Sequence, residues 1–147
     1  MARSSRSAPG GLHVHLVSIL AGFAANVTAV LSIVFMASIV MGPLADVSDA
    51  LALAADVLLG VVASATALFL GGFVAGRIAR ESGLFNGALV GLLNVGVSAA
   101  ILITSADVVL AGSDFLLAAV IAVAQLAIAT FGGRVGGASG RRPSSAY

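Results

Sequence analysis

Four uncharged polar side chains stand inside long apolar runs and are the first candidates for chemistry. They are two asparagines, a glutamine and a serine: Asn26, Ser64, Asn94 and Gln125. Amides and hydroxyls in such surroundings either line a path for a polar ligand or bond to one another and so fix how helices pair. No ionisable residue lies at the same depth of these runs, whereas proton-coupled transport normally uses one. We therefore expect a structural polar layer, with a small channel or transporter subunit as the alternative.

The remaining reactive side chains are few and poorly grouped. His13 and His15 are two residues apart, so on one helix they point to different faces and do not easily share a metal ion. Asp56 borders an apolar run, where an interfacial carboxylate is expected rather than a cation ligand. The chain has no cysteine and shows no serine–histidine–aspartate set or carboxylate pair. We expect no catalytic residue, no cofactor and no metal site.

The composition indicates an integral membrane protein. Of 147 residues, 60% are hydrophobic and only 9% are charged, and the mean hydropathy is +1.16. Ordinary globular domains carry about 25% charged residues. A formal net charge of +1 offers no basic field for nucleic acid. The lipid bilayer is therefore the expected partner, and nucleic acid is not.

Charged residues divide the chain into four neutral runs. These hold 39 residues between Arg6 and Asp46, 20 between Asp56 and Arg77, 25 between Glu81 and Asp107, and 19 between Asp114 and Arg134. A helix needs roughly 20 apolar residues to cross a bilayer, and an apolar run satisfies its backbone in lipid as a helix. Each run predicts one transmembrane helix, over residues 12–41, 57–76, 83–106 and 115–133.

The arginines and aspartates are sorted between alternate connecting segments. All seven arginines lie in 1–11, 77–82 and 134–147, and all five aspartates lie in 42–56 and 107–114. Four crossings place the arginine segments together on one side, which the positive-inside rule makes the cytoplasm. Both termini are then cytoplasmic, and 42–56 forms an outer loop with a helical stub. The lysine-free, Ala/Gly/Arg-rich composition indicates a GC-rich prokaryote and hence the cytoplasmic membrane.

Two local features are expected on the arginine side. Residues 77–82 are expected to form a tight turn, and Gly83, which directly follows it, is the candidate helix breaker. Residues 136–147 are rich in Gly, Ser, Arg and Pro, so we expect them to be disordered.

Small residues recur three or four positions apart in each predicted span. Helices associate in lipid through close backbone approach and interhelical hydrogen bonds. The stripe of the second span runs from Gly60 through Ser64 to Ala75. The glycines expected at helix contacts are Gly72, Gly76, Gly83, Gly87 and Gly91. Such faces suit packing within the chain, with further copies of it as a homo-oligomer, or with a larger membrane protein.

Two segments of the chain repeat each other weakly. GGFVAG at 71–76 returns as GGRVGG at 132–137, 61 residues later, and the same offset relates Arg80 to Arg141. The pattern favours two tandem hairpins of the same orientation. Chance similarity between Gly- and Ala-rich segments is the alternative.

The second and third spans carry a family-like motif. GGFVAGR at 71–77, followed by GLFNGALVGLL at 83–93, is similar to the GG-[FY]-x-AGR…GALxGLL segment of small four-span bacterial and archaeal membrane proteins. The resemblance implies a four-span helical fold. It implies no reaction, because that family has no assigned activity.

Together these features predict an all-α integral membrane protein. The expected architecture is a four-transmembrane-helix bundle with both termini cytoplasmic. The expected role is structural or interaction-based, without a catalytic site.

Overall fold

A computed structural model describes residues 15–41, 49–104 and 112–140, and the regular elements of these residues are all helical. They are α1 (Leu16–Met41), α2 (Asp49–Ala79), the 3₁₀ turn η2 (Arg80–Ser82), α3 (Gly83–Thr104) and α4 (Gly112–Gly140). Three stretches are long and apolar enough to cross a membrane: Leu16–Ile39, Ala52–Thr104, which holds most of α2 and all of α3, and Phe115–Gly140. The chain is therefore helical and of membrane type. The expected tail 1–11, most of the outer loops and residues 141–147 lie outside the described residues.

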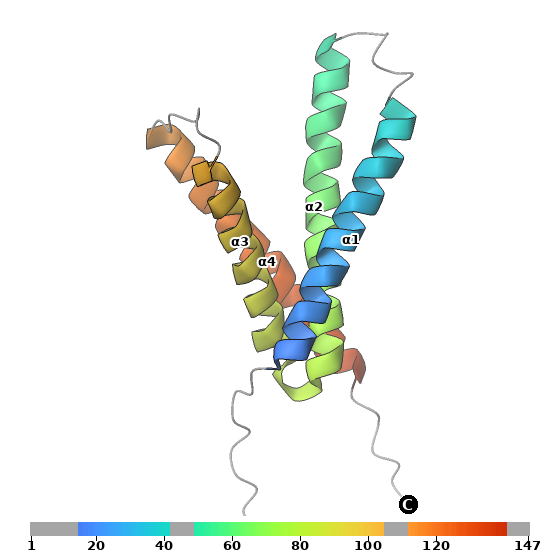
Figure 1. Cartoon of the computed structure of the whole chain (residues 1–147), viewed down its shortest axis with the longest axis vertical. Coiled ribbons are helices and arrows are strands. Elements are labelled where there is room, and N and C mark those ends of the chain that lie inside the picture. Colours follow the sequence, from blue (N-terminus) through green and yellow to red (C-terminus); the bar gives the residue numbers. More distant parts are fainter. Residues whose placement is uncertain (1–14, 42–48, 105–111, 141–147) are drawn as a thin grey trace, which may run out of the picture.

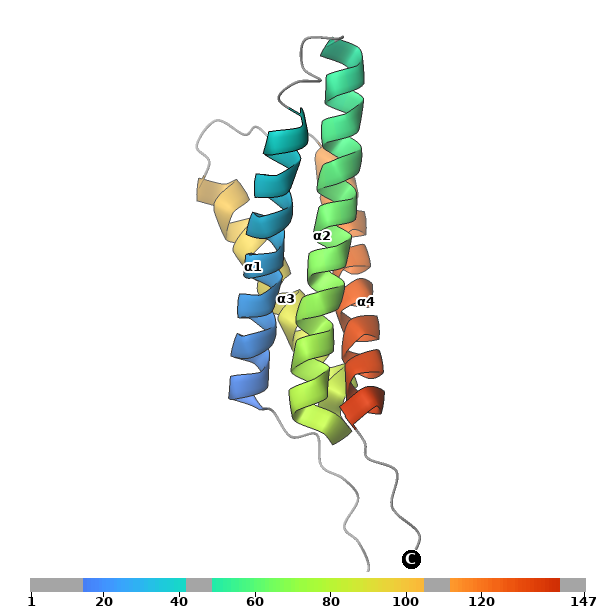
Figure 2. The same ribbon diagram turned by 90° about the vertical axis from the view of Figure 1, so that its right-hand side faces the viewer.

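The four helices form a V (Figure 1). One arm is α1 with α2, the other is α3 with α4, and the arms meet where α2 turns into α3. Figure 2 shows α1, α2 and α4 side by side, with α3 tilted behind them. Among the helices, α2 and α4 share the most extensive interface, so this pair joins the two arms.

Burial is concentrated at the closed end of the V. On α2, Ala67, Gly71 and Ala75 are buried, whereas Gly60 and Ser64, earlier on the same stripe, are exposed. Packing along the whole small-residue stripe is therefore a wrong expectation for its outer part, because the arms have separated at that level. Large apolar side chains cover the outer surfaces of the helices, as contact with lipid requires.

The reversal between α2 and α3 depends on Arg80. Its φ of 51° lies in the left-handed region, which costs a residue with a side chain about 1–2 kcal/mol. Gly83, the expected breaker, is helical with φ −56° and ψ −45°. That expectation is wrong because Gly83 is needed elsewhere: a Cβ atom on it would lie 2.7 Å from the carbonyl oxygen of Gly133.

Helix α4 is longer than the sequence predicts. It continues to Gly140, so the expectation of disorder is wrong for residues 136–140. Glycine is a poor helix former, but Gly136 and Gly137 are buried where α4 meets α2 and the α2–α3 turn. Tertiary packing, which supplies most helix stability in proteins, overrides the local preference.

Candidate functional site

Among the described glycines, those between α2 and α4 lie nearest to a neighbouring backbone. These helices run in the same direction, from the open end of the V to its closed end (Figure 1). A Cβ atom on Gly72 would collide with the carbonyl oxygen of Ala129, and one on Gly76 with that of Gly133. A side chain at either glycine would push the helices apart.

The same interface contains the converse contacts. A Cβ atom on Gly132 would collide with the carbonyl oxygen of Phe69, and one on Gly136 with that of Phe73. Carbonyl oxygens therefore lie against glycine Cα atoms from both sides, a close approach of the kind in which weak Cα–H···O contacts form. We call these four glycines and their carbonyl partners the glycine seam.

Helix α3 packs on α4 through its own glycine stripe. A Cβ atom on Gly87 would lie 2.7 Å from the Ala129 carbonyl oxygen, and one on Gly91 would lie 3.0 Å from the Ala129 Cβ. With Gly83 against Gly133, the three glycines follow one side of α4. The five glycines expected at helix contacts thus all lie against α4.

A chain of amides connects three helices just above these contacts. Asn26 Nδ2 on α1 donates to Asn94 Oδ1 on α3 at 3.0 Å. Asn94 Nδ2 in turn donates to Gln125 Oε1 on α4 at 3.4 Å, which is long for a strong bond. Asn26 is buried, and the other two are half-buried. Three of the four predicted polar residues therefore meet.

Ser64 is the predicted polar residue that does not join them. It is exposed on α2 and precedes Gly71 by about two helical turns. Gly71 is the part of α2 that touches Asn26: a Cβ atom on it would lie 2.8 Å from the Asn26 Cβ. Ser64 therefore lies apart from the three amides along α2, and its place near mid-membrane stays a prediction.

The α1 end of the amide chain is unsatisfied. Asn26 Oδ1 is buried and has no hydrogen-bond partner. Reversing all three amides would exchange donors and acceptors along the chain and leave Asn26 Nδ2 without a partner instead. A buried polar atom left unpaired costs about 1–3 kcal/mol. This end of the amide chain therefore carries an energetic cost that the other bonds of the chain do not remove.

A second polar cluster, which sequence reasoning missed, lies at the closed end of the V. Asn86 is fully buried, and its Oδ1 accepts from the backbone N–H of His15 at 3.1 Å and lies 3.2 Å from Ser18 Oγ. Its Nδ2 donates to the Ser82 carbonyl at 3.0 Å. The sequence does contain an indication of this role, because Asn86 directly precedes Gly87 and so lies beside the predicted contact stripe. Asn86 thus ties the start of α1 to the start of α3.

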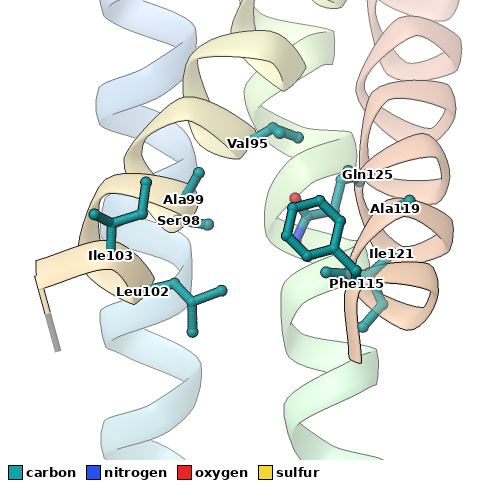
Figure 3. A pocket seen from close by; sticks show the side chains of 11 residues that line it. Val95, Ser98, Ala99, Leu102, Ile103, Phe115, Ala119, Ile121 and Gln125 are labelled. Atoms are coloured by element: carbon teal, nitrogen blue, oxygen red, sulfur yellow. The ribbon is translucent and has the colours of Figure 1, made fainter. Parts of the chain in front are cut away.

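A cavity separates the outer halves of α3 and α4. Its volume is about 410 Å³, and Figure 3 shows its lining side chains on the two helices. Most are apolar, including Leu102 of α3 and Phe115 of α4. Gln125 lines it from α4 and Ser98 from α3, so the amide chain reaches this cavity at one end.

The other candidates stand apart from these groups. His15 and Asp56 are both exposed, at opposite ends of the structure, and His13 lies outside the described residues. Within residues 15–41, 49–104 and 112–140, no three His, Asp or Glu residues are grouped so that they could hold a metal ion.

Comparison of the chain with protein-family models, curated proteins and solved structures found no match. Its function is therefore inferred from the geometry alone.

Proposed function

We propose that the chain crosses the cytoplasmic membrane four times, with both termini on the cytoplasmic side. The stretch Ala52–Thr104 would be about 80 Å long as one helix, against about 30 Å of hydrocarbon. It carries Arg77, Arg80 and Glu81 near its middle, where α2 ends and the chain reverses. Both facts favour two crossings within it, joined by a turn at the membrane surface.

Within that arrangement, the chain acts as a structural or interaction element of the membrane, with no reaction of its own. The observation that carries this is the amide chain: Asn26, Asn94 and Gln125 bond mainly to one another across three helices. Below them the glycine seam closes the molecule with direct backbone contact. The V then presents apolar arms to lipid, to further copies of the chain, or to a larger membrane protein.

Reconstitution into liposomes tests this role. The purified chain should give no flux of protons, Na⁺ or K⁺ above that of protein-free vesicles. The same samples should be examined for oligomeric state by cross-linking before solubilisation. Flux that scales with the amount of reconstituted protein would overturn the proposal.

A small channel or transporter subunit is the second candidate, and two observations favour it. Asn26 Oδ1 is buried without a partner, and Gln125 reaches the cavity between α3 and α4. On this hypothesis the amides bind a polar solute in turn as it crosses the membrane. An Asn94→Leu variant of nearly unchanged stability would then show strongly altered flux, whereas the structural role predicts no flux in either protein.

A further inference from the structure

Two further cavities meet on the surface of the α3–α4 arm at the closed end of the V. The first, about 280 Å³, is lined by Arg80, Glu81 and Arg134 and by the start of α3; we call it the arginine cavity. The second, about 430 Å³, is lined by Val123, Leu126, Ala127, Thr130 and Phe131; we call it the apolar groove. Leu84 and Arg134 line both, so the two cavities adjoin.

The paired cavities have the polarity of an amphipathic ligand with an anionic head. Two guanidinium groups and one carboxylate leave a net positive charge in the arginine cavity. The apolar groove starts at Arg134 and follows α4 back to Val123, which is about 16 Å at the rise of an α-helix. That length is about half of a hydrocarbon core of about 30 Å, and so about one leaflet.

We propose that this surface binds a phospholipid with an anionic headgroup, from the leaflet on the arginine side. The phosphate lies between Arg80 and Arg134, and one acyl chain lies in the apolar groove. The proposal rests on the four-pass arrangement, which puts the closed end of the V at the headgroups. It goes beyond that arrangement because it assigns the lipid class and the residues that select it.

The backbone of Arg80 is a second observation that points the same way. Its left-handed φ of 51° is the conformation in which glycine would be free of strain. Strain of this kind persists only where the surrounding structure holds the residue in place, and strained residues cluster at ligand-binding and switch sites. Arg80 lines the arginine cavity, so binding of an anionic group there would be such a function.

Lipid binding by the purified full chain, measured by native mass spectrometry or by titration in neutral detergent, tests the charge requirement. Phosphatidylglycerol should bind more tightly than phosphatidylcholine. Arg80→Gln and Arg134→Gln should each weaken phosphatidylglycerol binding about fivefold. Glu81→Gln should strengthen it, a gain that misfolding could not produce. Arg77→Gln is the matched control: Arg77 is exposed nearby but lines neither cavity.

A second pair of variants tests the groove. Ala127→Trp fills the apolar groove and should weaken phosphatidylglycerol binding, whereas Ala124→Trp, on an exposed part of α4 outside it, should not. Inorganic phosphate should compete only weakly, because it has no acyl chain.

Three results would overturn the proposal. They are equal binding of the two lipids, equal weakening by Arg77→Gln and Arg134→Gln, and full competition by phosphate with no effect of Ala127→Trp. Cysteine labelling of the topology, which does not depend on lipid binding, separates such a failure from failure of the four-pass arrangement.

Discussion

Gly72 and Gly132, 60 residues apart in the chain, make reciprocal contacts across the α2–α4 interface. Gly72 lies against the carbonyl of Ala129, three residues before Gly132, and Gly132 lies against the carbonyl of Phe69, three residues before Gly72. Gly76 and Gly136 repeat the relationship one turn later. The interface therefore has local two-fold symmetry about an axis parallel to the helices.

The tandem-hairpin hypothesis predicts a symmetry of this kind but stays a prediction, because the two offsets differ. Two hairpins of the same orientation would place α2 and α4 in equivalent positions, side by side and parallel, as the glycine seam has them. The sequence letters match at an offset of 61, whereas the contacts are related by 60. The residues that are equivalent in the packing are thus shifted by one position from the residues that match in the sequence repeat.

The first prediction follows from the symmetry. Gly72→Leu and Gly132→Leu should each destabilise the protein by about 1–3 kcal/mol, since each forces a side chain against a backbone carbonyl. The two losses should be similar. Thermal unfolding in detergent measures both.

Gly60→Leu is the control on α2, because a Cβ atom there meets nothing within 4 Å. It should leave stability unchanged or raise it slightly, since leucine is the better helix former. Equal losses at Gly60 and Gly72 would show that α2 does not pack on α4 through this face.

The second prediction concerns the amide chain. Gln125→Leu should cost about 1 kcal/mol or less, because interhelical hydrogen bonds in membrane proteins are weak on average. Asn94→Leu should cost about 1 kcal/mol, because it also leaves Asn26 Nδ2 without its acceptor. The double variant should cost less than the sum of the two, since the side chains share a bond. Strict additivity in a double-mutant cycle would contradict the contact.

Asn86 should matter more than Asn94. Asn86→Leu leaves the His15 N–H without its acceptor and removes the side-chain bond to the Ser82 carbonyl, at a residue that is itself fully buried. We expect a loss of about 1–3 kcal/mol, the cost of unpaired buried polar groups. A smaller loss than that of Asn94→Leu in the same unfolding assay would contradict this assignment.

Replacing two arginines at or near the α2–α3 turn by glycine should change the stability of the protein in opposite directions. Arg80→Gly relieves a left-handed backbone and should raise stability by up to about 1 kcal/mol. Arg77→Gly replaces a residue within helix α2 and should lower it by about 1 kcal/mol. Both variants remove one positive charge, so a shared change in the same direction would point to charge rather than to backbone conformation.

The sequence predicts the helices well because charge and hydropathy decide them locally. Charged residues bound the four apolar runs, and spacing identifies Gly83, Gly87 and Gly91 as one face. Residue spacing does not show at which level along the bundle neighbouring helices separate. Ser64 and Gly60 therefore lie on the same stripe as Gly71 and yet are exposed.

Two other differences have the same origin in tertiary contact. Residues 136–140 read as a disordered tail by composition, but they are helical because their glycines meet the end of α2 and the turn that follows it. In the sequence Asn86 is a single polar residue near a helix start. Its role depends on contact with α1, where Ser18, 68 residues earlier in the chain, lies beside it.

The four-pass arrangement with the closed, arginine-bearing end in the cytoplasm is the central claim, and cysteine labelling tests it most directly. The chain has no cysteine of its own, so single substitutions report without background. In intact cells a membrane-impermeant maleimide should label Ser48→Cys but not Glu81→Cys, and Glu81→Cys should react only after permeabilisation. Labelling of Glu81→Cys in intact cells would contradict the account.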